Sequence, residues 1–258
     1  LDRPQPKGVV LLCGPFPTER LYALAPWMRW ARYLNRRGYA AIRFDYRGTG
    51  ESTGCFADFG FDDWLSDTEH MSKWAQALYP DSPLVLHGMA MEGLLAQQVF
   101  AKGTGRALLM WSAPACAEDI LRKGLLARIS ADMLLLKPSE RKTPADYFED
   151  LAQGKPLHVD GYPWSRPLWQ SARLIKMASE YVSSGEGIEP TQGRPWKHLV
   201  LGPEMAPLVR SAAHSRALNP RSALVPRFPL NPDLTPFHAS NVEWIQRALD
   251  PQKGTLHA

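Results

Sequence analysis

The chain has 258 residues, 45% hydrophobic and 22% charged, a profile typical of a globular protein with one sizeable core or at most two small ones. Its formal net charge is +4, but the lysines and arginines are scattered, so the charge does not favour nucleic acid as a partner. Cys13, Cys55 and Cys116 share no motif spacing, which excludes a disulfide framework or a zinc site and fits reduced thiols in the cytoplasm.

Strands and helices are predicted to alternate through the first half of the chain. The continuous apolar run from Val9 to Cys13 is typical of a strand that is buried on both faces. The stretch 26–37 places Trp27 and Trp30 on one face of an amphipathic helix, and Gly38 is typical of its end. The same patterns predict strands over 39–46, 84–86 and 107–111 and helices over 61–78 and 93–101. Such an alternation predicts a mostly parallel sheet with helices on both faces.

The alternation breaks after residue 115. Residues 116–187 contain predicted helices over 120–136, 144–153 and 164–179 and only a short strand over 157–159. A strand over 198–202 resumes the alternation, and a strand over 224–228 and a helix over 239–249 follow. We therefore predict an α/β core of residues 1–115 and 188–258, with residues 116–187 as a helical cap over one end of the sheet.

A glycine-rich segment, RGTGESTG over 47–54, follows the second predicted strand. One interpretation is a dinucleotide-binding fingerprint, but that motif requires its glycines to open a helix directly after the first strand. Here Gly48, Gly50 and Gly54 lie in what reads as a continuing loop. We expect a tight loop that uses the positive φ available to glycine, with Asp45 and Arg47 fixing it in place.

The segment LVLHGMAMEG, residues 84–93, leads from a strand through a tight turn into a helix. Together with CGPF, RFDYRGTGESTG, LVLGPE and a histidine before the last helix, it resembles the α/β-hydrolase fold. The segment GYAAIRFDYRGTGESTGCFADFGFDDW and the HVDGY at 158–162 are similar to serine-aminopeptidase-like and exosortase-system-associated hydrolases of bacterial exopolysaccharide gene clusters. The strand pair that opens this fold is not visible before Leu1, which would fit a truncated N-terminus.

The resemblance implies a set of catalytic positions, the first of which is vacant. In the pattern G-x-S-x-G the nucleophilic serine falls on Ala90, and a methyl group cannot attack a carbonyl. The backbone N–H groups of Met91 and Phe16 fall where the fold places its oxyanion donors. His238 falls on the base, and Glu204 on the acid that would orient it. A structural His238 near a helix start and a solvated Glu204 are the alternative interpretations.

Other side chains near these positions are open to a non-catalytic interpretation. Cys13 and Ser112 end two predicted strands and could substitute for the nucleophile, but neither opens a helix, and packing is the favoured interpretation. His87 is expected to be a hydrogen-bonded histidine at a strand end. Glu92 replaces the second glycine of the motif, although Gly93 follows at once.

Three explanations of Ala90 compete: a degenerate hydrolase kept for binding or for supporting a partner, an enzyme without a covalent intermediate or with a substitute nucleophile, and an engineered Ser→Ala. Glu92 and Met205 also depart from the pattern, which counts against the engineered replacement. We predict a cytoplasmic, non-hydrolytic relative of acyl-ester and thioester hydrolases that binds a small acyl-type ligand or a protein partner. No cofactor, metal or nucleic acid is expected. No membrane span is expected either, because no apolar run approaches about 18 residues. The ligand pocket is expected under the cap, lined by Trp164, Trp169, Met133 and Leu134.

Overall fold

A computed structural model describes residues 5–183, 185–188, 193–201 and 234–250. Its centre is a six-stranded sheet in the order β2-β1-β3-β4-β8-β7. Five strands are parallel, and β7 at one edge runs antiparallel to β8. The strands are β1 (Val9–Cys13), β2 (Ala40–Arg43), β3 (Leu84–Met89), β4 (Ala107–Trp111), β7 (Gly185–Ile188) and β8 (Pro195–Leu199). The predicted mostly parallel sheet is confirmed.

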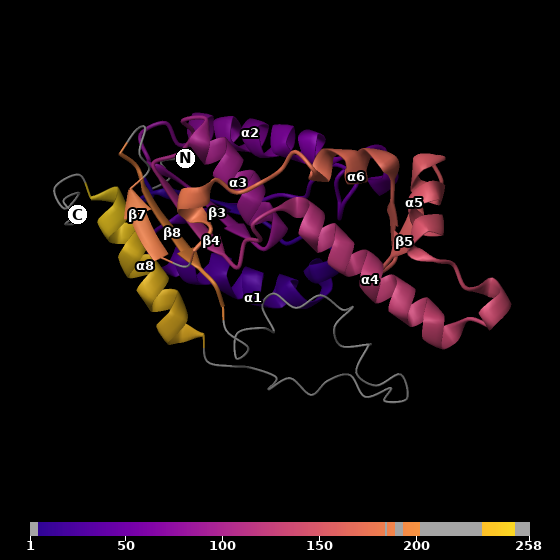
Figure 1. Ribbon diagram of the computed structural model, residues 1–258. Coiled ribbons are helices and arrows are strands. Elements are labelled where there is room, and N and C mark those ends of the chain that lie inside the picture. The colour runs from indigo at the N-terminus through magenta and orange to yellow at the C-terminus, as the bar shows by residue number, and fades with distance from the viewer. Residues whose placement is uncertain (1–4, 184, 189–192, 202–233, 251–258) are drawn as a thin grey trace.

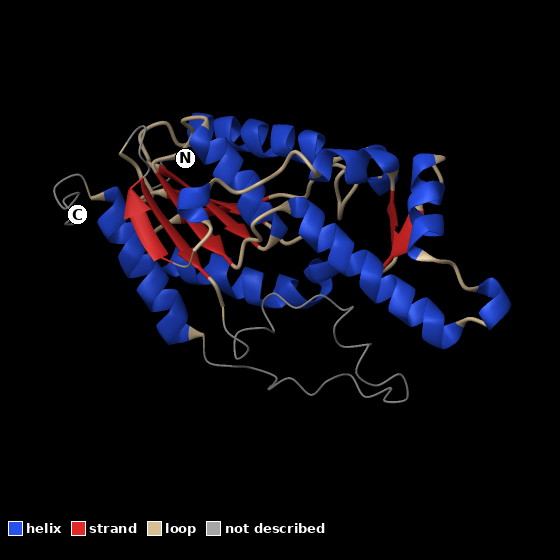
Figure 2. Ribbon diagram, in the orientation of Figure 1, coloured by secondary structure: helices blue, strands red, loops and turns tan. Residues whose placement is uncertain are grey.

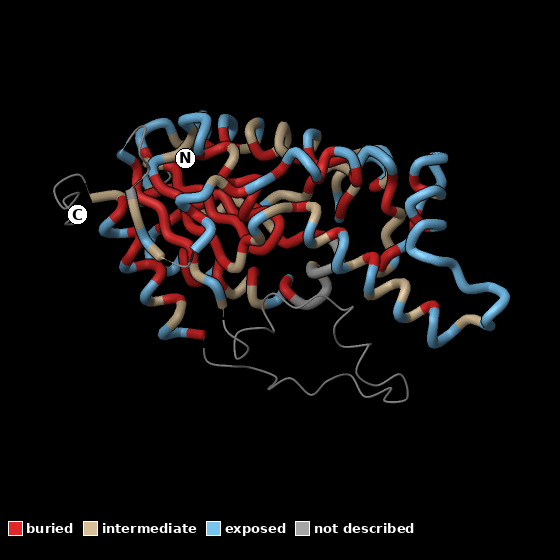
Figure 3. Tube along the Cα trace, in the orientation of Figure 1, coloured by how far each residue is buried: buried red, intermediate tan, exposed pale blue. Residues whose placement is uncertain are grey.

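Helices cover both faces of this sheet (Figures 1 and 2). One face packs against α1 (Pro17–Arg36) and α8 (Thr235–Leu249), and the other against α2 (Phe61–Leu78) and α3 (Met91–Ala101). Successive residues of β1 alternate between the two sides: Val9, Leu11 and Cys13 join the α2/α3 core, whereas Val10 and Leu12 join the α1/α8 core. The strand is therefore apolar throughout because both of its faces are buried (Figure 3).

The chain after β4 forms the predominantly helical insertion that extends away from the sheet in Figure 1. It comprises α4 (Ala117–Leu135), α5 (Pro144–Ala152), a hairpin of β5 (Leu157–Val159) and β6 (Tyr162–Trp164), and α6 (Arg166–Ala172). Helix α6 attaches the insertion to the core, because Ser171 Oγ accepts a hydrogen bond of 2.8 Å from the N–H of Phe61 at the start of α2. The limits predicted for core and cap stay a prediction.

Three local differences from the predicted elements have physical causes. Helix α1 begins at Pro17 rather than at residue 26, because Pro17 fits the first turn and Pro26 is accommodated inside the helix. Strand β6 was not predicted, and only its last residue, Trp164, fell within a predicted helix; Asp160 and Gly161, with φ of 50° and 87°, form the two-residue turn that pairs it with β5. The strand predicted over 224–228 lies outside the described residues.

Arg194, which precedes β8, caps the end of α3. Its guanidinium donates hydrogen bonds to the carbonyls of Phe100, Gly105 and Thr104 at 2.6, 3.1 and 3.2 Å, and lies 3.9 Å from the centre of the Phe100 ring. The Phe100 carbonyl lies in the last turn of α3, where carbonyls have no i+4 partner within the helix, and Thr104 and Gly105 lie between α3 and β4. Arg194 therefore holds in place the C-terminal end of α3, the helix that follows Ala90.

We expect Arg194→Lys to lower the free energy of unfolding by about 1–3 kcal/mol, because an ammonium group cannot reproduce the forked contacts of a buried guanidinium. Urea denaturation measures this loss. The matched control is Arg122→Lys, whose exposed pair with Glu118 at 2.8 Å should contribute under about 0.5 kcal/mol. Equal effects of the two substitutions would contradict the capping role.

Candidate active site

The turn between β3 and α3 has the strained backbone that the motif predicts. Ala90 has φ 54° and ψ −128°, a combination rare for a residue with a side chain, which costs about 1–3 kcal/mol. Its N–H donates to the carbonyl of Trp111 at 2.8 Å, and its own carbonyl accepts from the N–H of Gly93 at 3.0 Å. The two bonds fix the turn at the ends of β3 and β4.

Two glycines make this turn possible. A Cβ on Gly88 would lie 2.5 Å from the carbonyl oxygen of Glu92, and a Cβ on Gly93 would lie 2.5 Å from Cβ of Ala113. The chain therefore approaches positions 88 and 93 too closely for a side chain at either one. Glu92, in the place of the second glycine of the motif, is buried and 2% exposed. The departure from the motif at position 92 is thus compatible with an intact turn.

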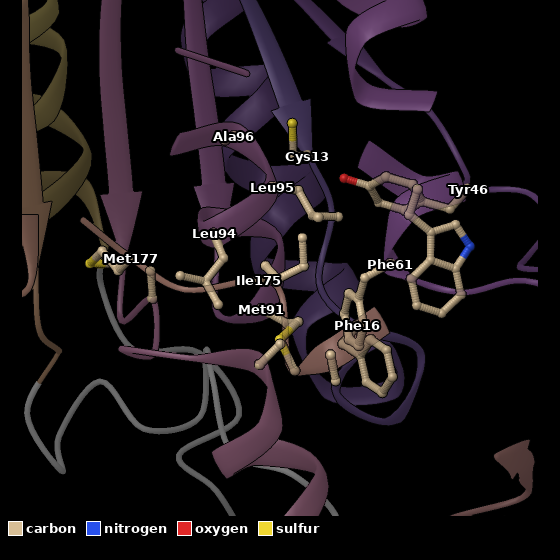
Figure 4. Close-up of a cluster of buried hydrophobic side chains, with 14 of the residues drawn as sticks. Cys13, Phe16, Tyr46, Phe61, Met91, Leu94, Leu95, Ala96, Ile175 and Met177 are labelled. Carbon is tan, nitrogen blue, oxygen red and sulfur yellow. The ribbon is translucent and has the colours of Figure 1, made fainter. Parts of the chain in front are cut away.

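The two predicted oxyanion donors lie at the starts of helices. Met91 is the first residue of α3, and the first N–H groups of a helix have no carbonyl partner within it. Phe16 directly precedes α1, and its ring packs against Phe61 and Trp64 with centroid distances of 6.1 and 5.8 Å. Figure 4 shows the side chains of Phe16 and Met91 within one buried cluster. This packing holds both backbone segments in place, and the oxyanion role stays a prediction.

His238, the predicted base, lies in the first turn of α8 and is 5% exposed. Its ring packs against Trp30 and Tyr33 of α1 with centroid distances of 5.0 and 5.3 Å. Trp30 also contacts His87, which lies three residues before Ala90 on β3. His238 thus joins a group of aromatic rings beside β3, and its catalytic role stays a prediction. Glu204, the predicted acid, lies outside the described residues.

His87 is fully buried in that same group of rings. Its ring lies 4.4 Å from Trp111, 4.9 Å from Trp27 and 6.0 Å from Trp30, measured between centroids. Neither ring nitrogen has a hydrogen-bond partner among the described residues, so the expectation of a hydrogen-bonded histidine is wrong. Burial, and secondarily the nearby His238, hold the pKa of His87 well below its usual range. The ring is therefore neutral at physiological pH.

The two substitute nucleophiles are engaged elsewhere. Cys13 is fully buried, and burial raises the pKa of its thiol to about 12, with the charge of Glu92 acting in the same direction. A hydrogen bond from Tyr46 offsets this only in part, and Figure 4 shows the Tyr46 hydroxyl directed towards Cys13. Ser112 Oγ accepts a hydrogen bond of 2.9 Å from the N–H of Leu201. Neither group is poised for nucleophilic attack.

The glycine-rich loop is fixed by ion pairs, as expected. Asp45 accepts from the Arg20 guanidinium at 2.7 Å and from the N–H of Glu51 at 3.0 Å. Arg47 pairs with Asp67 at 2.6 Å. The glycines at 48, 50 and 54 have φ of 73°, 54° and 94°, and a short 3₁₀ turn (Phe56–Asp58) follows instead of a helix that starts at the glycines. These contacts favour a structural loop over a dinucleotide site.

The four residues expected to line a pocket under the cap are not brought together. Trp164 is buried against Gly124, and Trp169 packs on Phe148 with a centroid distance of 5.3 Å. Met133 and Leu134 are instead exposed on α4, at 49% and 64%. Trp164 and Trp169 therefore belong to the packed interior of the insertion, and the ligand pocket under the cap stays a prediction.

The described ranges contain neither a candidate metal site nor a candidate membrane-spanning helix. There, no group of three or more His, Cys, Asp or Glu side chains is placed to hold a metal ion. None of the described helices combines the length and the apolar character needed to cross a bilayer.

The chain matches one family model and is similar to several solved α/β hydrolases. A model of the family described as serine aminopeptidase, S33, matches residues 22–160. Est1E of Butyrivibrio proteoclasticus, solved with ferulic acid bound, is similar at 20% identity and a TM-score of 0.49, over 68% of this chain and 64% of that one. An α/β serine hydrolase without a lid from Xanthomonas campestris is similar at 24% identity and a TM-score of 0.38, over 44% of this chain and 52% of that one. The chain thus spans about half the length of the latter structure. No curated protein matches the chain.

The backbone strain at Ala90 can be tested by substitution. Ala90→Gly should be at least as stable as the wild type, because glycine adopts this conformation without steric penalty. Ala90→Val should lose about 2 kcal/mol, since a β-branched residue is disfavoured at positive φ. The control is Ala96→Gly, a buried position within α3 where about 1 kcal/mol is lost. If Ala90→Gly destabilises as much as Ala96→Gly, position 90 is not strained.

Buried His87 predicts acid sensitivity. Its folded pKa lies below the unfolded value of about 6.5, so the unfolded state binds more protons and stability falls as pH drops below about 6.5. His198, whose pKa burial also lowers, contributes in the same direction. His87→Phe should make the stability slope shallower by up to about 1.4 kcal/mol per pH unit between pH 6.5 and 5. Exposed His158→Gln is the control, and equal slopes in all three proteins would contradict the assignment.

Proposed function

The chain belongs to the serine aminopeptidase S33 family of the α/β hydrolases, and from this membership we propose that it binds an acyl-type ligand without hydrolysing it. The observation that carries the proposal is Ala90, which has the backbone conformation of a nucleophile turn and a methyl group in place of a hydroxyl. The turn is retained at a cost of about 1–3 kcal/mol, although it presents no reactive atom. A ligand-binding function would explain why the strained turn at Ala90 is retained.

The absent nucleophile limits what the site can do. Serine hydrolysis needs an oxygen that forms an acyl intermediate, a base that accepts its proton, and N–H groups that stabilise the oxyanion. In the proposed site the backbone N–H groups of Met91 and Phe16 can still bind a carbonyl oxygen. His238 and Glu204 keep the positions of base and acid in the proposal, but they have no hydroxyl to activate. Bound ligand is therefore retained intact.

An active hydrolase with a substitute nucleophile is less well supported. The high pKa of the Cys13 thiol leaves almost no thiolate near neutral pH, and the Ser112 hydroxyl is held by a backbone N–H. Engineered loss of a serine would leave the rest of the motif unchanged, whereas Glu92 departs from it as well. Both observations favour a chain that has diverged from hydrolysis.

The sequence alone supports the biological system and the cellular location proposed for the protein. The resemblance to exosortase-system-associated hydrolases supports an accessory role in bacterial exopolysaccharide systems, with an acyl-type ligand or a protein partner. The three free cysteines support a cytoplasmic location, because they share no disulfide spacing.

Fluorophosphonate labelling and p-nitrophenyl butyrate turnover test the proposal. The wild type should show neither, because position 90 carries no hydroxyl. Ala90→Ser should restore less than about 1% of the activity typical of a serine hydrolase, a kcat/KM of about 10⁴ M⁻¹s⁻¹ or more, since the His238 ring packs against Trp30 and Tyr33.

Each alternative outcome has a distinct meaning. Wild-type turnover that is lost in His238→Ala would overturn the proposal, and Cys13→Ala and Ser112→Ala would then identify the nucleophile. Efficient rescue by Ala90→Ser would contradict divergence and favour a recent or engineered loss of the serine.

A further inference from the structure

Helix α4 of the insertion carries a group of large apolar side chains that are exposed to solvent. Leu126, Met133 and Leu134 are 60%, 49% and 64% exposed, and Leu135 at the end of the helix is 75% exposed. Single exposed apolar side chains are ordinary on a protein surface, whereas a contiguous group of them marks an interaction surface. We call these four residues the α4 apolar patch.

The helix itself brings the members of the patch together. Met133 and Leu134 follow Leu126 by seven and eight residues, so after two turns they return to the same side of α4. The other side of the helix carries Leu121 and Leu125, which are buried in the core. Figure 1 shows α4 running away from the sheet, so the patch lies on the outer part of the insertion.

Contacts on the buried side fix the orientation of α4. The carboxylate of Asp132 accepts a hydrogen bond of 2.5 Å from the Tyr147 hydroxyl of α5, and another of 2.9 Å from Nε of Arg128. Gly124 packs so closely on Trp164 of β6 that a Cβ at position 124 would collide with the ring. The helix therefore cannot rotate the patch inwards without losing these contacts.

Basic residues lie beside the patch. The segment 122–142 contains six Lys or Arg but only two acidic residues, and both acids accept hydrogen bonds from within the protein. Three of the basic residues already pair with acidic side chains. The other three, Lys123, Lys137 and Arg141, are exposed and form no ion pair among the described residues. Positive charge therefore flanks the patch along the chain, directly before and after it.

We propose that the outer side of α4 is a docking surface for an anionic lipid bilayer. The α4 apolar patch enters the headgroup region, and Lys123, Lys137 and Arg141 lie against the lipid phosphates. An apolar stripe accompanied by cations is the composition with which a helix binds in the plane of a membrane surface, where apolar burial and attraction to anionic lipids add. This role goes beyond the proposed ligand binding and does not rest on it.

Two other occupants fit the surface less well. A second copy of the chain would meet it through a twofold contact, which places the same surface of each copy face to face and brings the unpaired cations of both together. A protein partner is usually held by aromatic or arginine side chains seated in pockets. The patch offers only leucine and methionine side chains that project from one helix.

Vesicle co-sedimentation tests the proposal. The wild type should bind phosphatidylcholine vesicles that contain about 30% phosphatidylglycerol at least about 10-fold more tightly than pure phosphatidylcholine vesicles, and raised salt should weaken the binding. Leu126→Gln/Leu134→Gln should weaken it about 10-fold or more by removing apolar area from the patch. Lys123→Gln/Lys137→Gln should weaken it by a similar factor, and only on the anionic vesicles.

Trp74→Gln/Leu78→Gln is the matched control. These two side chains are 51% and 41% exposed on α2, outside the insertion, so their loss should change vesicle binding less than about 2-fold. Because all the substituted side chains are exposed, thermal unfolding should show that each variant folds with a melting temperature close to that of the wild type.

Four results would overturn the proposal. They are no vesicle binding by the wild type, equal binding to both kinds of vesicle, equal losses in the patch and control variants, and a melting temperature that falls markedly in Leu126→Gln/Leu134→Gln. The last would show that the chain itself covers the patch. Size-exclusion chromatography with light scattering examines the second copy: a wild-type dimer that the patch variant abolishes, without vesicle binding, would assign this surface to self-association instead.

Discussion

The backbone turn at Ala90 is the constraint on which the rest of the site depends. Its positive φ is enforced from both sides: Trp111 accepts its N–H, and Gly88 and Gly93 allow the helix to start against the strand. A side chain at either glycine would collide with backbone or with Ala113. The turn therefore persists because β3, α3 and β4 over-determine it, whatever side chain stands at position 90.

That arrangement explains how the turn can be intact although position 90 carries no hydroxyl. The serine of a hydrolase contributes its hydroxyl to chemistry, whereas the turn is built by neighbouring residues. Arg194 and Ser171, far along the chain, stabilise the end of α3 and the start of α2 respectively. A methyl group in place of a hydroxyl at position 90 leaves these interactions in place, so the proposed absence of hydrolysis is compatible with a stable scaffold.

The sequence predicted those features that depend on local pattern. Buried strands such as β1 and β4 were predicted with their observed limits, because continuous apolar runs have few other solutions. Strand β7 was not predicted, since Gly185 and Gly187 carry no pattern and their conformation depends on pairing with β8. His87 was misjudged for a similar reason: the rings around it come from α1 and β4, and only the fold brings them together.

The same separation explains why the sequence did not single out Trp27. In the sequence it is one of several apolar residues on a helix face, and packing is the ordinary role of such a residue. Its distinctive property, a buried indole nitrogen without an acceptor among the described residues, appears only in the folded structure. An unsatisfied buried donor costs about 1–3 kcal/mol, a sizeable part of a net stability of about 5–15 kcal/mol.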